Sequence, residues 1–195
     1  LATPRWISVD HPDQLPDKLP LPFPAIVKPR WQGSGIGIDA GAVVRTPAEL
    51  RGRVRALYAR WPEPVLIEAF IEAGELTVLV IGNDPPVAYP AVQRPLDSAT
   101  RLAYHVVHRN TDGPWEAPLA LTPELDREAQ RIATTMFAAL GCHDVARVDL
   151  RVDAQGRAQF LEINPLPSYD PDGTIGLIAQ HLGVTYRDLI GRILD

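Results

Sequence analysis

Residues 146–165, ARVDLRVDAQGRAQFLEINP, constrain the fold more than any other part of this sequence. They are typical of two β-strands joined by a turn at residues 153–156, because alternating apolar and polar residues flank a run of turn-forming residues. The apolar sets are Val148, Leu150 and Val152 in the first strand and Leu161 and Ile163 in the second. A slip of one residue would send one apolar set to the polar side. Asp149, Glu162 and Asn164 are therefore predicted to share a face.

The polar face of this hairpin concentrates negative charge. One compatible register sets Asp149 directly opposite Glu162, which is destabilising unless a positive group lies between the two carboxylates. Arg147 lies on the same face, but one guanidinium cannot balance both acids. Two carboxylates and the Asn164 amide are hard oxygen ligands that suit Mg²⁺, with water and nucleotide phosphates completing the octahedron. The alternative is a surface hairpin whose charges are merely solvated.

A glycine-rich segment follows a short apolar strand at residues 25–28. Lys28 ends that strand, and RWQGSGIGI follows at residues 30–38. Glycines allow backbone N–H groups to turn toward phosphate oxygens, Ser34 adds a hydroxyl, and Lys28 adds a compact positive charge. The segment matches neither the P-loop nor the dinucleotide-binding pattern. A hairpin turn that needs glycine for backbone reasons is the alternative.

A third segment, LIEAFIEAGELTV at residues 66–78, has one strand ending in Glu68 and another beginning at Glu75. Backbone groups between two strands can face a planar base, and a carboxylate such as Glu75 can accept hydrogen bonds from ribose hydroxyls. Solvated turn acids are the alternative interpretation.

Short apolar runs alternate with helical periodicity in the rest of the chain, which indicates an α/β or α+β fold. We expect helices at about 47–61, 123–140, 174–182 and 185–194. Further strands are expected near Ile38, at 65–68, at 75–81 as a central strand covered on both faces, and at 87–92. Residues 93–121 lack periodicity and are interpreted as a functional flap.

Composition excludes several classes of protein. The chain has 195 residues, 46% of them hydrophobic and 22% charged, with a formal net charge of −5. It therefore lacks the bulk positive field that holds nucleic acid or anionic membrane, and no partner of either kind is expected. No apolar run reaches the roughly 20 residues needed to cross a bilayer, and no signal pattern opens the chain, so a cytoplasmic location is predicted.

Taken in order, KPRWQGSGIGI, LIEAFIEAGELTV, ARVDLRVD and FLEINPLP resemble the ATP-grasp superfamily, and most closely the D-alanine–D-alanine ligase family. The resemblance covers the chain from about Thr3 to Leu194, and Glu162 and Asn164 follow Asp149 with the family's spacing. It implies an α+β ATP-grasp fold in which two α+β subdomains grip a nucleotide between antiparallel sheets. Residues 1–70 would be the central subdomain with the phosphate loop, and residues 71–195 the C-terminal subdomain with the metal site. The family's N-terminal domain is not represented before Leu1, so a missing domain or a partner would complete the site.

The same resemblance implies roles for individual residues, with ATP and Mg²⁺ as cofactors and Mn²⁺ as an alternative metal. The proposed nucleotide-binding residues are Lys28, Gly33, Ser34 and Gly35 at the phosphates, Glu68, Ala69, Phe70 and Ile71 at the adenine-side hinge, Glu75 at the ribose, and Leu161 under the adenine. Asp149, Glu162 and Asn164 would bind the metal. Arg147 would stabilise the tetrahedral intermediate, and the loop with Ser34 would fold over the phosphates. For a second phosphate-side cation, the sequence leaves Arg94, Arg101 and Arg109 open.

The implied activity is an ATP- and Mg²⁺-dependent carboxylate–amine ligase that forms a peptide bond through an acyl phosphate, with small amino acids or peptides as substrates. The segment LPSYDPDGTIG at 166–176 lacks the family's Ser-Leu pair at the second-substrate site, which leaves substrate identity open. The alternatives are a fragment of a true D-alanine–D-alanine ligase and a non-catalytic ATP-binding module completed by a partner. A homodimer is also left open.

Overall fold

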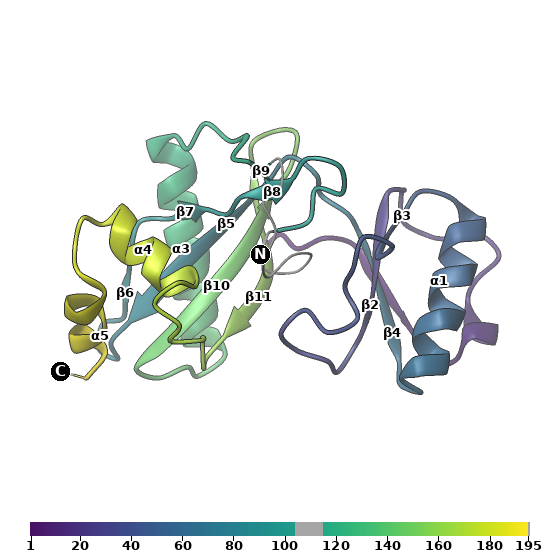
Figure 1. Ribbon diagram of the computed structural model, residues 1–195, viewed down its shortest axis with the longest axis horizontal. Helices are drawn as coiled ribbons and strands as arrows, with labels where there is room; N and C mark the ends of the chain where they lie inside the picture. The colour runs from purple at the N-terminus through teal and green to yellow at the C-terminus, as the bar shows by residue number, and fades with distance from the viewer. Residues whose placement is uncertain (104–114, 195) are drawn as a thin grey trace. The chain divides into compact units, whose positions relative to one another are not determined.

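The computed structural model describes residues 1–103 and 115–194 of the chain (Figure 1). The chain divides into two compact units, each with its own sheet and core. Unit 1 comprises Leu1–Thr3, Ala73–Arg94 and Ala117–Asp195, and unit 2 comprises Pro4–Glu72 and Pro95–Glu116. The α+β class is confirmed. The assignment of a phosphate loop to residues 1–70 and of a metal site to residues 71–195 stays a prediction. Within the described residues, no helix combines the length and apolar character required to span a membrane.

Unit 2 is built on an antiparallel sheet with the strand order β1-β4-β2-β3. Its strands are β1 (Trp6–Val9), β2 (Ala25–Pro29), β3 (Val43–Val44) and β4 (Val65–Ala69). Helix α1 (Pro47–Arg60) packs on one face through Leu50, Val54 and Leu57. Unit 2 also contains a 3-10 turn (Pro12–Gln14) and the paired short strands β8 (Leu96–Asp97) and β9 (Trp115–Glu116), which lie in the predicted flap.

The strand expected near Ile38 is wrong, because that segment turns twice. Ile36 N donates to Gly33 O at 3.0 Å, and Ile38 N donates to Gly35 O at 3.0 Å. Gly35 and Gly37 have φ values of 72° and 76°, so consecutive tight turns occupy residues 33–38. The strand that pairs with β2 begins five residues later, at Val43.

Unit 1 contains an antiparallel sheet with the order β11-β10-β5-β6, and β7 also pairs with β5. Its strands are β5 (Gly74–Ile81), β6 (Val87–Ala88), β7 (Val92–Gln93), β10 (Val145–Val152) and β11 (Ala158–Asn164). All eight residues of β5 are buried, which confirms a central strand covered on both faces. Its helices are α3 (Pro123–Ala139), α4 (Thr174–His181) and α5 (Tyr186–Leu194).

Helices lie on both faces of the unit 1 sheet, α3 on one face and α4 and α5 on the other (Figure 1), and an apolar cluster lies under each set of helices. Helix α3 packs on one face, where its Ile132 and Phe137 join Val78 of β5 and Val148 of β10. On the other face, α4 and α5 pack against a smaller apolar set that includes Leu79. The second cluster does not extend along the whole sheet, and the residues beyond it are polar.

Near Asp149, the β10–β11 hairpin has the one register that the sequence analysis named as compatible. Asp149 pairs with Glu162 and Arg147 pairs with Asn164. The register then shifts, so that Leu150 pairs with Phe160 and Leu161 becomes the extra residue of a β-bulge. Phe160, with Ile163, packs against the α3-side core. The expectation that Leu161 completes the apolar set opposite Leu150 is therefore wrong, because a bulge reverses the alternation beyond it.

Candidate nucleotide and metal site

Strand alternation places a row of polar and charged side chains on the face of the unit 1 sheet that does not face α3. Glu75 and Thr77 lie on this face of β5, and Arg147, Asp149 and Arg151 lie on it in β10. Leu79, farther along β5, is covered by α4 and α5. One end of the face is thus apolar and the other end carries charge.

Asp149 is at the centre of this charged end and is only 2% exposed. Arg147 donates to it through Nε at 3.0 Å and Nη2 at 2.8 Å, and Thr77 Oγ1 donates to its Oδ1 at 2.8 Å. Arg94 Nη1 lies 3.5 Å from its Oδ2. Burial disfavours the charge of Asp149, but attraction to Arg94 and Arg147 and the hydrogen bonds outweigh burial and lower its pKa. Asp149 is therefore an anion at neutral pH.

Glu75 is held by two guanidinium groups. Arg94 Nη1 donates to Glu75 Oε1 at 2.8 Å, and Arg151 Nη2 lies 2.9 Å from Oε2. Burial opposes the charge on Arg94, yet attraction to Glu75, then Asp149 and Glu162, raises the pKa of Arg94. Arg94 consequently bridges the two buried carboxylates as a permanent cation.

Glu162 and Asn164 lie at the outer edge of the cluster. The Glu162 side chain is 60% exposed, and its Oε1 is 4.0 Å from Arg147 Nη2. Asn164 Oδ1 accepts a hydrogen bond from Leu166 N at 3.2 Å. Arg147 thus lies between the facing Asp149 and Glu162, and Arg94 is a second cation attracted to both acids.

The fold brings the three predicted metal ligands to neighbouring positions of one hairpin. Two carboxylates and an amide fit the hard-oxygen preference of Mg²⁺. Both oxygens of Asp149 already accept hydrogen bonds from Arg147, so a cation at Asp149 would compete with or share these contacts. No group of three or more His, Cys, Asp or Glu side chains suited to a metal ion occurs among residues 1–103 and 115–194. The metal role of Asp149, Glu162 and Asn164 stays a prediction.

Unit 2 carries Lys28 and Glu68 on the face of its sheet opposite α1. Lys28 Nζ lies 2.6 Å from Glu68 Oε2, and both side chains are largely buried. Ala69 ends β4, and Phe70 N donates to Pro24 O at 2.9 Å. The structure pairs Lys28 with Glu68, while the phosphate and adenine-side roles of Lys28, Glu68, Ala69, Phe70 and Ile71 stay predictions.

The glycine-rich loop is anchored on both sides of its tip. Glu63 accepts hydrogen bonds from Trp31 N at 3.0 Å and Gln32 Nε2 at 2.8 Å. Arg53 of α1 donates to Gly37 O at 2.7 Å. Ser34, at the tip, is exposed and has a φ of 55°. The anchored loop exposes Gly33 and Ser34, and the phosphate role of Gly33, Ser34 and Gly35 stays a prediction.

Sequence reasoning missed the buried positions of Arg94 and Thr77. The sequence signal was weak, because β7 has only two residues; in the structure Gln93 pairs with Leu76, so the next residue, Arg94, lies beside Glu75. Of the other arginines left open for the phosphates, Arg101 contacts Glu116 at 2.6 Å, and Arg109 lies outside the described residues.

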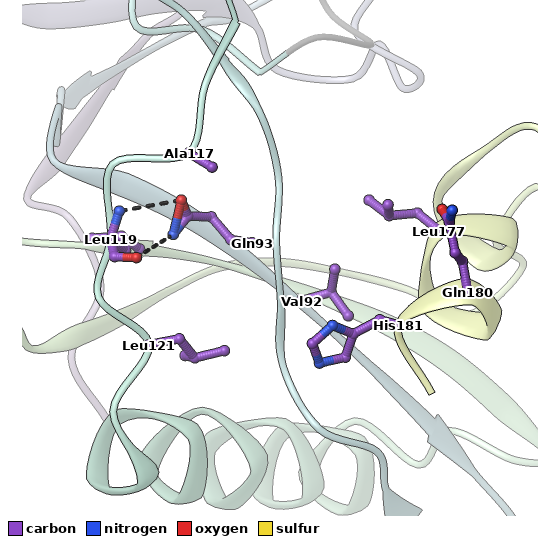
Figure 2. A pocket seen from close by; sticks show the side chains of 8 residues that line it. All are labelled: Val92, Gln93, Ala117, Leu119, Leu121, Leu177, Gln180 and His181. Carbon is purple, nitrogen blue, oxygen red and sulfur yellow. Dashed lines mark hydrogen bonds between the residues drawn. The ribbon is translucent and has the colours of Figure 1, made fainter. Parts of the chain in front are cut away.

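Unit 1 also contains an open cavity of about 470 Å³ (Figure 2). Figure 2 shows Leu177 and His181 of α4 on one side and Leu119 on the other. The Gln93 side chain exchanges two hydrogen bonds with the backbone of Leu119, at 3.0 and 3.1 Å. None of the predicted site residues lines this cavity.

Known proteins match this chain over most of its length. Residues 9–195 match the family model described as D-ala D-ala ligase C-terminus. D-alanine–D-alanine ligase B of Chromobacterium violaceum is 32% identical over 90% of this chain and 55% of its own length. The chain spans about half the length of the curated relatives it matches.

Solved structures agree in fold. The VanG D-Ala:D-Ser ligase from Enterococcus faecalis superposes with a TM-score of 0.77 and 19% identity, over 100% of this chain and 56% of that chain. The D-alanine–D-alanine ligase from Bacillus anthracis complexed with ATP has a TM-score of 0.71 and 24% identity, over 100% of this chain and 58% of that chain. The likeness shows the fold alone, and it is the ATP-grasp fold expected from the sequence motifs. On the family match over residues 9–195, the chain belongs to the D-ala D-ala ligase C-terminus family.

Proposed function

We propose that this chain is the ATP-grasp part of an ATP- and Mg²⁺-dependent carboxylate–amine ligase that forms a peptide bond through an acyl phosphate. The observation that carries the proposal is the placement of Arg147 between Asp149 and Glu162 on one hairpin, in a chain of this family. The names of the relatives support a ligase, and the ATP complex of the Bacillus anthracis protein supports the nucleotide.

In this proposal, most of the site residues bind ATP or Mg²⁺, and one stabilises the transition state. Lys28 and the Gly33–Gly35 loop bind the phosphates, Glu68 through Ile71 and Leu161 bind the adenine, and Glu75 binds the ribose. Asp149, Glu162 and Asn164 hold Mg²⁺. When bound, MgATP supplies the phosphoryl group that activates the carboxylate.

Arg147 has the catalytic role in this scheme. Its guanidinium is kept oriented by Asp149, with N–O distances of 2.8 and 3.0 Å, and so can donate to an oxyanion without reorganising. The loop with Ser34 excludes water from the reactive acyl group. Few protein bases are needed, because charge placement and exclusion of water are the main requirements.

The substrate class is a small amino acid or peptide. D-Alanine is the first compound to test as carboxylate and as amine, because relatives are named for it, and D-serine is the second, because a structural neighbour is a D-Ala:D-Ser ligase. A true D-alanine–D-alanine ligase is the alternative within this class. The relatives are about twice as long, so substrate assays belong on a protein that includes the family's remaining domain.

Calorimetric titration with a non-hydrolysable ATP analogue, with and without Mg²⁺, tests the nucleotide site. We expect Mg²⁺-dependent binding that weakens in Asp149→Asn and Glu162→Gln. Glu124→Gln is the matched control, because Glu124 is an exposed acid of α3 paired with Arg127. Binding that ignores Mg²⁺ and both site substitutions would contradict the assignment. Nucleotide binding without ADP release in the presence of amino acids would favour a non-catalytic ATP-binding module.

A further inference from the structure

Arg94 is buried among acids in a way that the proposed mechanism does not use. Only 7% of Arg94 is exposed. Its backbone is fixed beside β5, because Arg94 N donates to Glu75 O at 2.9 Å. Its Nη1 atom then contacts both Glu75, at 2.8 Å, and Asp149, at 3.5 Å. One nitrogen thus joins the carboxylate proposed for the ribose to a carboxylate proposed for the metal.

The charges around Arg94 explain why the two acids tolerate burial. Arg151 contacts Glu75 and Arg147 contacts Asp149, so each of these two acids also contacts a cation from β10. Arg94 is shared by both acids and is also attracted to Glu162. A shared cation holds two like charges at a fixed separation, and its removal leaves buried negative charge incompletely compensated.

A divalent cation near Asp149 and Glu162 would meet this same guanidinium. The two positive groups repel one another, and both require the oxygens of Asp149. We propose that Arg94 is a positioning residue that acts as the internal counter-cation of the metal site: it holds Glu75 and Asp149 together without metal and competes with a divalent cation for Asp149. This inference rests on the proposed function, because it takes Asp149 and Glu162 as metal ligands.

The inference predicts that removal of Arg94 changes protein stability and divalent-cation affinity in opposite directions. Removing Arg94 makes the metal-free protein less stable, because two buried carboxylates lose their shared cation. The same change makes divalent-cation binding tighter, because the competing charge is gone. If Arg94 had a purely structural role, its removal would lower the stability of the protein and would leave its affinity for the metal unchanged or weaker.

The experiment measures Mn²⁺ binding to the purified chain without nucleotide, from the electron paramagnetic resonance signal of free Mn²⁺, and thermal unfolding without metal. We expect Arg94→Met to bind Mn²⁺ on the order of tenfold more tightly than the wild type and to unfold at a lower temperature. Arg94→Lys keeps the charge and should stay near the wild-type affinity. Arg157→Met is the matched control, because Arg157 pairs with Asp153 in the hairpin turn and its loss changes net charge equally.

If Arg94→Met does not fold, the comparison of Glu75→Gln with the double variant Glu75→Gln/Arg94→Met poses the same question without an extra buried charge. The double variant should bind Mn²⁺ more tightly than Glu75→Gln. Glu162→Gln separates the proposed metal site from the proposed role of Arg94 as its counter-cation. One outcome would overturn the counter-cation role and keep the metal site: Glu162→Gln abolishes Mn²⁺ binding, whereas loss of Arg94 leaves that binding unchanged or weakens it. Absence of Mn²⁺ binding in every form would overturn both.

Discussion

At the residue scale, the stability of unit 1 at acid pH depends on Asp149. Its pKa lies below the ordinary value of 3.8, since Arg94 and Arg147 outweigh the effect of burial. The native state therefore binds fewer protons here than the unfolded state. This contribution is complete above pH 3.8 and is lost as the pH falls through that value toward the native pKa.

We expect Asp149→Asn to flatten the dependence of unfolding free energy on pH between about pH 5 and pH 3. Urea unfolding followed by circular dichroism at several pH values measures this slope. Asp149→Asn also disturbs Arg94 and Arg147 and so changes the absolute stability for other reasons. The slope of unfolding free energy against pH is therefore the quantity that reports on the titration of Asp149. A slope equal to that of the wild type would show that Asp149 is not the titrating group.

A second residue-scale feature is the backbone of the glycine-rich loop. Gly37 has a φ of 76°, and a Cβ there would lie 2.5 Å from Pro29 Cγ. We expect Gly37→Ala to cost about 2 kcal/mol of unfolding free energy, from the left-handed backbone and the contact with a rigid ring. Gly33→Ala is the control, because nothing lies within 4 Å of a Cβ at Gly33. Equal effects of the two substitutions in urea unfolding would contradict this account.

Residue-level prediction from sequence succeeded where a local pattern fixed the geometry. Alternation in the hairpin was enough to put Asp149 and Glu162 on one face, and the structure has the compatible register in which they pair. It failed for Leu161, because the bulge depends on tertiary packing, and for Arg94, because β7 has only two residues and its pairing with β5 leaves little trace in sequence. Partners from distant segments cannot be read from a single strand's periodicity.

At the element scale, the helices follow local signals closely. Thr46 caps α1 by accepting from Glu49 N at 3.2 Å, and Thr122 caps α3 by accepting from Leu125 N at 3.2 Å, each followed by proline. These caps are why the starts of both helices could be predicted from the sequence. In the first turn of α1, Glu49 accepts a hydrogen bond from Arg45 N at 2.8 Å.

Helix α4 depends on a close approach that its sequence pattern does not reveal. A Cβ at Gly176 would lie 1.7 Å from Pro171 O, which is a backbone atom. Gly176→Ala should lower the unfolding free energy by about 2 kcal/mol or more, because the incoming segment must move. Gly191→Ala in α5 meets nothing within 4 Å and should stabilise by about 0.5–1 kcal/mol through helix propensity. Destabilisation by both would mean that glycine flexibility, and not this contact, matters in α4.

At the scale of the whole molecule, the two units have separate cores. The α1-side core lies in unit 2, and the α3-side and α4–α5 clusters lie in unit 1. We expect the unit 1 substitution Gly176→Ala to shift the denaturation midpoint seen by circular dichroism more than the midpoint seen by tryptophan fluorescence. Equal shifts would show that the two cores unfold as one cooperative block.

The distribution of chromophores makes that distinction measurable without engineering. All four tryptophans, Trp6, Trp31, Trp61 and Trp115, belong to unit 2, whereas the single cysteine, Cys142, is a free thiol of unit 1. A dye attached to Cys142 would therefore accept excitation energy from donors that all lie in the other unit. The efficiency of energy transfer from tryptophan to this dye therefore depends on the separation of the two units, and it can be measured while nucleotide or metal is added.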